Sequence, residues 1–314
     1  MKRTDISVVV PVYNSEQGLP ALVQRLESVL WQIANKYELI LVNDGSKDGS
    51  WRVIGELSLK HPWIRGFDLM RNYGQHNALL CGIRAARMDI VVTLDDDLQN
   101  PPEEMHKLIE LLDDQTDVVY GTPVEEQHGF FRDVASIVTK LALQSMMGAQ
   151  TARSVSAYRA FRTCLRDAFS RFQSPFVSID VLLTWGTSRF ASVRIQHVPR
   201  QISTSQYTLR KLVAHAVNMM TGFSVLPLQI SSWIGFGFTL FGMGVLVYVI
   251  GRYFLLGYSV PGFPFLASVI AIFSGAQLFA LGIIGEYLAR MHYRIMDRPG
   301  YAIRESLSAT SNEL

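Results

Sequence analysis

Short apolar runs alternate with stretches of helical periodicity over the first hundred residues. The runs are rich in β-branched residues and short enough for strands buried on both faces of a parallel sheet. Strands are expected at residues 6–12, 38–42 and 90–94, and helices at residues 19–33, 51–59 and 75–86. Strands that alternate with helices form βαβ units. The pattern therefore predicts an α/β domain with a doubly wound, mostly parallel sheet.

The last third of the chain has a different pattern, because residues 212–251 and 253–285 contain no Asp, Glu, Lys or Arg. About 20 apolar residues cross the roughly 30 Å hydrocarbon core of a bilayer. Two transmembrane helices are expected, near residues 228–250 and 265–285, and two buried helices of a soluble domain are the alternative. Gly, Ala and Ser are frequent in the second segment and favour close helix packing. Residues 211–226 are expected to form an interfacial amphipathic helix.

Basic residues flank this apolar hairpin on both sides and indicate its orientation. They are Arg194, Arg200, Arg210 and Lys211 before it, and Arg290, Arg294, Arg298 and Arg304 after it. The turn at residues 254–262 is uncharged, and Arg252 can reach the interface by snorkelling. The N-terminus lacks the long apolar region of a signal peptide. We expect an inner (plasma) membrane protein with a cytoplasmic domain (1–210), the interfacial helix (211–226), a transmembrane hairpin (227–290) and a cytoplasmic tail (291–314).

Composition narrows the class of protein. A content of 49% hydrophobic and 18% charged residues excludes a disordered chain. The net charge of +2 gives no support to non-specific nucleic-acid binding, so no nucleic-acid partner is expected. Cys81 and Cys164 have neither metal-ligand spacing nor the density of a disulfide scaffold.

Polar clusters follow the three expected strands, at the end of a parallel sheet where ligands bind. The cluster at residues 43–49 also has the composition of an ordinary turn that caps a helix. Asp95, Asp96 and Asp97 are harder to explain, because adjacent carboxylates repel one another. Alternate residues of an extended segment share a face, and hard cations accept carboxylate oxygens while bridging substrate phosphates. Metal ligation by Asp95 and Asp97 is favoured over helix capping before Pro101 and Pro102.

Four segments in order carry a resemblance to a known family. They are Val10-Pro-Val-Tyr-Asn14, Val42-Asn-Asp-Gly-Ser46, Arg71-Asn-Tyr-Gly-Gln75 and Leu94-Asp-Asp-Asp-Leu-Gln-Asn-Pro-Pro102. The set resembles glycosyltransferase family 2, which has the Rossmann-like GT-A fold. The two apolar segments, followed by Leu281-Gly-Ile-Ile-Gly-Glu-Tyr-Leu288 and Arg298-Pro299, are similar to the membrane-bound polyprenyl-phosphate glycosyltransferases. The resemblance covers nearly the whole chain.

The resemblance implies transfer of a sugar, a hexose or a modified sugar, from a UDP-linked donor to a polyprenyl phosphate with inversion. In a bacterium the acceptor would be undecaprenyl phosphate. The family's donor-binding positions correspond to Pro11, Tyr13, Glu16, Asp44, Arg71, Gln75, Asp95, Asp96 and Gln99. Asp95 and Asp97 correspond to the functional pair of the Asp-any-Asp motif, which implies Mg²⁺ or Mn²⁺ as cofactor. The metal would stabilise the charge that develops on the diphosphate.

Arginines are the next group that the resemblance singles out, because planar guanidinium suits phosphate binding. Arg132, Arg153 and Arg159 are candidates for the lipid phosphate, and Arg200 is a candidate catalytic residue. Arg200 precedes Ser205-Gln-Tyr207, where relatives often have Gly-any-Ser-Lys-Tyr. Ser203 therefore replaces the Gly and Gln206 the Lys, a departure that bears on donor identity.

The family's general base is missing from its usual places. Relatives have an Asp two or six residues before the position of Arg159, where this chain has Ala157 and Arg153. Either Asp180 substitutes for it, or no strong base is needed, because the second pKa of a phosphomonoester is about 6. A helix cap or a structural salt bridge is the favoured alternative role for Asp180.

Two other functions fit the same sequence. One is a family 2 transferase with a diacylglycerol or polysaccharide acceptor, and the other is a non-catalytic nucleotide-sugar-binding partner of a flippase. The resemblance also implies a homo-oligomer, a tetramer in several members, in contact with membrane lipid.

Overall fold

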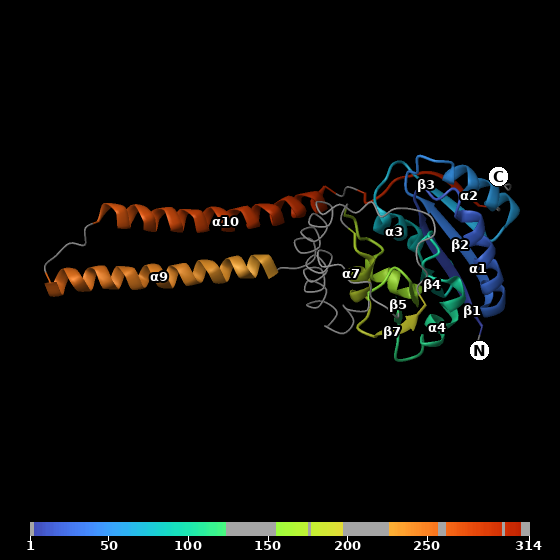
Figure 1. Ribbon diagram of the computed structural model, residues 1–314, viewed down its shortest axis with the longest axis horizontal. Helices are drawn as coiled ribbons and strands as arrows, with labels where there is room; N and C mark the ends of the chain where they lie inside the picture. Colours follow the sequence, from blue (N-terminus) through green and yellow to red (C-terminus); the bar gives the residue numbers. More distant parts are fainter. Residues whose placement is uncertain are drawn as a thin grey trace. The chain divides into compact units, whose positions relative to one another are not determined.

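A computed structural model describes residues 3–123, 155–174, 177–196, 226–256, 262–296 and 299–308 (Figure 1). The chain divides into two compact units. The first comprises Met1–Val213 together with Asp297–Leu314, and the second comprises Ala214–Met296. The residues that follow the apolar hairpin therefore return to the first unit.

One sheet of eight strands organises the described part of the first unit, in the order β7-β5-β6-β4-β1-β2-β3-β8. The strands are β1 (Thr4–Val12), β2 (Ala34–Asn43), β3 (Ile64–Leu69), β4 (Ile90–Thr93), β5 (Val118–Pro123), β6 (Arg159–Arg162), β7 (Phe190–Ile195) and β8 (Ile303–Leu307). Strands β4, β1, β2 and β3 are parallel neighbours. Strand β6 runs antiparallel between β4 and β5, and β8 runs antiparallel along β3. This central parallel core confirms the predicted α/β class.

Helices cover both faces of the sheet. They are α1 (Leu19–Ile33), α2 (Ser50–Lys60), α3 (Gln75–Ala85), α4 (Met105–Glu110) and α7 (Ile179–Thr184), with 3₁₀ segments η1 (Pro102–Glu104) and η2 (Thr163–Phe169). Val8 and Val10 of β1 belong to the core that includes α1, α2 and α4. Gly82 of α3 packs against Val9 on the opposite face. Figure 1 shows α3 across the sheet from α1. Alternate residues of one strand thus support two helical layers, as the pleat requires.

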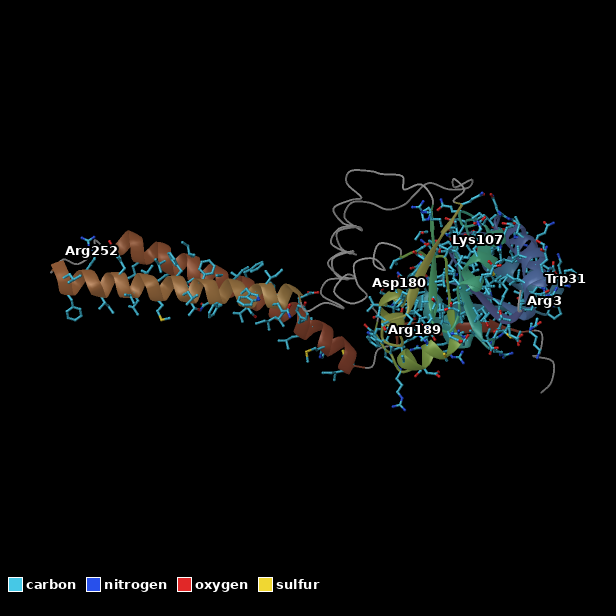
Figure 2. All side chains as sticks on the ribbon, turned by 90° about the horizontal axis from the view of Figure 1, so that it is seen from below. Arg3, Trp31, Lys107, Asp180, Arg189 and Arg252 are labelled. Atoms are coloured by element: carbon cyan, nitrogen blue, oxygen red, sulfur yellow. The ribbon has the colours of Figure 1, made fainter. Side chains whose placement is uncertain are left out.

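The second unit is a pair of long apolar helices, α9 (Leu226–Leu256) and α10 (Phe263–Ile295), that run side by side (Figure 1). Segments Leu228–Arg252 and Ile272–Ala289 are long and apolar enough to cross a membrane, and neither is buried in protein. A Cβ on Gly242 would lie 2.9 Å from the Phe273 ring, so this glycine permits close approach of the two helices. Arg252, near the end of the hairpin in Figure 2, donates a hydrogen bond to Tyr248 Oη at 3.1 Å.

Among the described residues, the structure contains every strand and helix predicted from the sequence, together with strands that were not predicted. The three predicted strands, the three predicted helices and the helical nature of both apolar segments are confirmed. Strands β3, β5, β6, β7 and β8 were not predicted. The interfacial helix expected at residues 211–226 lies outside the described residues except for Leu226, where α9 begins. Strand β8 lies in the segment that was expected to be a tail.

Candidate functional site

The carboxyl ends of β4, β1, β2 and β3 meet at one edge of the sheet. Val9 pairs with Thr93, Val12 with Asn43, and Asn43 with Asp68. The polar segments that follow these strands therefore lie side by side, as the sequence predicted. Pro11 is buried opposite Val42, whereas Tyr13 is exposed.

The loops after β1 and β2 hold each other through hydrogen bonds. The Asn14 amide donates to Ser46 Oγ at 3.0 Å, and the Lys47 amide donates to Asn14 Oδ1 at 2.8 Å. Asn14 has a φ of 54°, a left-handed conformation that Asn tolerates better than most residues. Glu16 accepts hydrogen bonds from the Gly49 amide at 3.0 Å and from Arg52 at 2.8 Å. Glu16 thus caps the N-terminus of α2, where a carboxylate is stabilising.

Asp44 connects the end of β2 to the loop between β3 and α3. Its two carboxylate oxygens accept hydrogen bonds from the amides of Tyr73 (2.7 Å) and Gly74 (2.9 Å). Burial raises the pKa of Asp44, and the two amides partly offset that shift. Gly45 has a φ of 65°, and a Cβ there would lie 2.5 Å from the Asn72 nitrogen. The two loops therefore form one closely packed block.

Arg71 and Gln75, two predicted donor-binding residues, flank the turn that Asp44 holds. The Arg71 guanidinium is exposed and stacks over the Tyr73 ring, 4.6 Å from its centroid. Gln75 is the first residue of α3 and donates from Nε2 to Asp95 Oδ1 at 2.6 Å. Both side chains lie at the edge where the parallel strands end.

The three adjacent aspartates have different surroundings. Asp96 accepts hydrogen bonds from the Tyr13 amide at 3.2 Å and from the Ser15 hydroxyl, so it ties the loop after β1 to the end of β4. Burial raises the pKa of Asp96, against the effect of these two donors. Asp95 accepts from Gln75, and Asp97 Oδ1 accepts from the Gln99 amide at 3.1 Å. Both outer carboxylates are half-buried.

The carboxylates of Asp95 and Asp97 suit a cation whose remaining ligands come from the substrate and from water. Among the described residues, no group of three or more His, Cys, Asp or Glu side chains is placed to hold a metal ion. Mg²⁺ commonly binds through one or two carboxylates and completes its coordination with substrate phosphates and water. The donor set of Asp95 and Asp97 is of that kind.

Arg159 and Asp180 form an ion pair, and Arg159 lies opposite Thr93 at the end of β4. Arg159 of β6 donates from Nη1 to Asp180 Oδ1, and Tyr120 Oη donates to the same oxygen at 3.1 Å. Arg159 and Asp180 are both buried, and Asp180, labelled in Figure 2, belongs to α7. The Arg159 Nε is buried without a hydrogen-bond partner in the described structure. Roles for Arg159 in lipid-phosphate binding and for Asp180 in catalysis stay predictions.

Several other predicted positions can be located. The Ala157 carbonyl accepts a hydrogen bond from the Thr93 hydroxyl at 2.8 Å, so the position of the family's missing base lies beside the end of β4. Arg132, Arg153 and Arg200 lie outside the described residues.

A second polar group, not predicted from the sequence, lies at the same edge. Asn43 Nδ2 donates to Asp68 Oδ1 at 2.6 Å, and Arg304 Nη1 donates to Asp68 Oδ2 at 3.1 Å. Asp68 is buried, and only its place in an apolar segment shortly before Arg71 could have signalled its importance. Together, the strand ends present carboxylates, fixed loops and an exposed guanidinium, an arrangement that can bind a phosphorylated ligand together with a cation.

Comparisons with known proteins agree with this geometry. The family described as Glycosyl transferase family 2 matches residues 7–172. The undecaprenyl-phosphate 4-deoxy-4-formamido-L-arabinose transferase of Pectobacterium carotovorum is 34% identical, covering 98% of this chain and 95% of the relative. The Aeromonas hydrophila protein of the same name is also 34% identical, with 99% and 98% covered.

A solved structure supports the fold. Glucosyl-3-phosphoglycerate synthase from Mycobacterium tuberculosis, in complex with Mn²⁺, UDP and glucosyl-3-phosphoglycerate, has a TM-score of 0.52 at 19% identity. The match covers 69% of this chain and 78% of that one. The extent of the family match and the nearly full-length relatives lead to one conclusion: the chain belongs to glycosyltransferase family 2.

Proposed function

We propose that the protein transfers a sugar from a nucleotide-sugar to undecaprenyl phosphate at the cytoplasmic face of the inner membrane. The observation that carries the proposal is the extent of its similarity to undecaprenyl-phosphate transferases. That similarity covers 98% of the chain, so it includes the two apolar helices as well as the sheet domain. A lipid acceptor explains why one chain joins a nucleotide-sugar fold to helices of this length.

The donor in this proposal is a UDP-linked modified sugar. The names of the relatives make 4-deoxy-4-formamido-L-arabinose the first sugar to test. Ser203 and Gln206 replace the Gly and Lys common in relatives, and this departure bears on donor identity. UDP-linked hexoses are therefore tested as donors as well. A few contacts in a pocket decide between such sugars.

The acceptor phosphate supplies its own nucleophile. Its second pKa is about 6, so a phosphate oxygen is largely ionised near pH 7. That oxygen attacks the anomeric carbon while the bond from this carbon to the diphosphate oxygen breaks, and the bonding electrons leave with UDP. The configuration at the anomeric carbon inverts. Ala157 at the family's base position and the pairing of Asp180 with Arg159 both support a reaction without a protein base.

Residues of the sheet edge hold and orient the donor. Asp95 and Asp97 would bind Mg²⁺ or Mn²⁺, which when present neutralises charge on the departing diphosphate. Arg71 lies at the same edge and adds positive charge. Arg132, Arg153 and Arg200 remain candidates for binding the lipid phosphate and for closing the site. The tetramer and the flippase partner stay expectations from the family resemblance.

The test uses the purified full-length protein in detergent. Undecaprenyl phosphate, Mg²⁺ or Mn²⁺ and a panel of UDP-sugars are incubated with it, and the lipid product is identified by mass spectrometry. Asp97→Asn is expected to lose roughly a hundredfold or more in turnover, because stabilisation of developing charge is removed. Asp114→Asn changes an exposed aspartate outside the four motifs, so it is the matched control and should retain full turnover.

Three outcomes would contradict the proposal. Labelling of diacylglycerol or a polysaccharide instead of the polyprenyl phosphate would support the alternative acceptor. Binding of a UDP-sugar without product from any donor would support a non-catalytic partner of a flippase. Equal turnover of Asp97→Asn and Asp114→Asn would show that Asp97 has no part in the reaction.

A further inference from the structure

We infer that Arg304, in the C-terminal strand β8, is a positioning residue for the nucleotide-sugar site. The inference rests on the proposed function, because it assigns the donor to the edge formed by β1 to β4. Arg304 acts through Asp68 and Met70 on the loop that carries Arg71. Strand β8 thereby becomes part of the support of a site whose predicted donor-binding residues lie in the first hundred positions.

The C-terminal segment occupies both backbone polar groups of Met70. The Met70 amide donates to the Ala302 carbonyl at 2.9 Å, and the Met70 carbonyl accepts from Arg304 Nη2 at 2.8 Å. Strand β8 pairs with β3 up to this point, with Leu69 opposite Ile303 (Figure 1). Because Met70 directly precedes Arg71, these bonds fix the start of the loop between β3 and α3.

The second contact of Arg304 is with a buried carboxylate. Asp68 is 2% exposed, and its oxygens accept from Arg304 on one side and from Asn43 on the other. Asn43 Oδ1 in turn accepts from the Ser46 amide at 3.3 Å. A buried carboxylate that loses one partner is costly, so its surroundings rearrange to restore one. Loss of Arg304 is therefore expected to disturb the loop after β2 as well as the loop after β3.

These two loops are coupled to each other. Asp44, next to Asn43, accepts from the amides of Tyr73 and Gly74, and the Gly45 backbone packs against Asn72. One guanidinium thus supports a block whose members include the predicted donor residues Asp44, Arg71 and Gln75. Because the contacts of Arg304 are with Asp68 and the Met70 carbonyl, we assign it a positioning role and not one in contact with the substrate.

Gly300 and Tyr301, which precede β8, also pack closely against residues of the sheet domain. A Cβ on Gly300 would lie 2.8 Å from Asn77 Oδ1 and 3.0 Å from the Ser174 carbonyl oxygen. The Arg84 guanidinium lies over the Tyr301 ring, 5.8 Å from its centroid. Only residues 296–302 separate the end of α10 from β8. The strand that supports the donor site thus follows the second apolar helix in the sequence after a short connection.

The test compares two arginines with similar surroundings. Arg304 binds one buried aspartate and one backbone carbonyl, and Arg162 likewise contacts Asp117 at 3.3 Å and the Asp113 carbonyl at 2.7 Å. Arg304→Met is expected to raise the KM for the UDP-sugar about tenfold, a change equivalent to about 1.4 kcal/mol. The KM for undecaprenyl phosphate should change less than twofold. Arg162→Met should leave both constants unchanged, and Arg304→Lys should recover part of the loss by restoring the charge near Asp68.

Two further measurements separate this inference from the proposed function and from simple unfolding. Hydrogen–deuterium exchange reports the amides of Tyr73 and Gly74 without any need for turnover, and these should exchange about tenfold faster in Arg304→Met than in Arg162→Met. Affinity for UDP, measured by calorimetry, should fall in parallel. Normal exchange and a normal donor KM in a folded Arg304→Met protein would overturn the inference and leave the proposed function intact. If the two variants show the exchange difference but the wild-type protein transfers no sugar, the proposed function alone would be overturned.

Discussion

Residues that look equivalent in the sequence differ in their hydrogen-bond partners. Among the three consecutive aspartates, the middle one, Asp96, is bound to the backbone of Tyr13 and to the Ser15 hydroxyl. Asp44 similarly uses both oxygens on backbone amides. Each of these two side chains organises a loop, whereas Asp95 and Asp97 remain the better candidates for cation binding. The distinction depends on which donors surround each carboxylate, and that requires the fold.

Asp180 provides a prediction at this scale. Asp180→Asn removes the counter-charge of Arg159, which is 2% exposed, and breaking a buried ion pair in this way costs about 3–5 kcal/mol. The Tm is expected to fall by on the order of 10 °C. Tyr120→Phe removes only one hydrogen bond to the same carboxylate, at a cost of about 1 kcal/mol. Thermal unfolding in detergent compares the two, with Asp167→Asn on the exposed surface as control.

The same variants test the role of Asp180 in catalysis. If the acceptor phosphate ionises by itself, turnover per folded Asp180→Asn molecule keeps its acidic limb near pH 6, the second pKa of a phosphomonoester. Disappearance of that limb, together with a loss of turnover greater than the loss of folded protein, would instead identify Asp180 as the base.

Elements differ in how much of their structure the sequence can predict. Strands β1, β2 and β4 are apolar because both their faces are buried, so their pattern is visible without a structure. Strand β8 reads Ile-Arg-Glu-Ser-Leu and lies at the edge of the sheet, where charged residues are tolerated. Its pairing with β3 joins residues more than two hundred positions apart, and no local pattern carries such information.

The sequence likewise predicts some features of the candidate site and not others. The sequence places polar residues at strand ends, since the ends of parallel strands share an edge of the sheet. It cannot reveal that Asp44 binds the amides of residues 73 and 74, because those contacts depend on the loop conformations. The contact between Asp68 and Arg304 depends on the return of the chain after the apolar hairpin.

Gly82 of α3 and Gly55 of α2, in helices on opposite faces of the sheet, allow the helix packing to be tested by substitution. A Cβ on Gly82 of α3 would lie 2.3 Å from Val9 Cγ1, so Gly82→Ala forces α3 away from β1 and is expected to cost about 1–3 kcal/mol. On Gly55 of α2 the nearest atom would be Leu307 Cδ1 at 3.7 Å, an ordinary contact. Gly55→Ala should therefore stabilise the protein by about 0.5–1 kcal/mol through helix propensity. A lower Tm for Gly82→Ala and a higher Tm for Gly55→Ala, each relative to wild type, would support this packing. Equal shifts in Tm would contradict it.

At the scale of the whole molecule, the chain leaves the sheet domain, forms the apolar hairpin and then returns to complete the sheet. Residues 297–314 belong to the same compact unit as residues 1–213. An acceptor dissolved in the membrane and a donor dissolved in water need one protein that meets both phases. Residues 296–302 connect the end of α10 to β8, the strand that pairs with β3.

The two cysteines allow the proposed orientation to be measured on the intact chain. Cys164 is exposed in the sheet domain, whereas burial raises the pKa of Cys81 to about 12 and leaves little reactive thiolate. A membrane-impermeant maleimide should therefore label Cys164 in inside-out vesicles and not in spheroplasts. Leu255→Cys, placed near the end of α9 in a Cys164→Ser background, should show the reverse, because residue 255 lies at the start of the uncharged turn at residues 254–262 and is highly exposed. Labelling of both positions from the same side would exclude a hairpin that crosses the membrane, and labelling of Cys164 in spheroplasts would place the sheet domain on the wrong side for a cytoplasmic nucleotide-sugar.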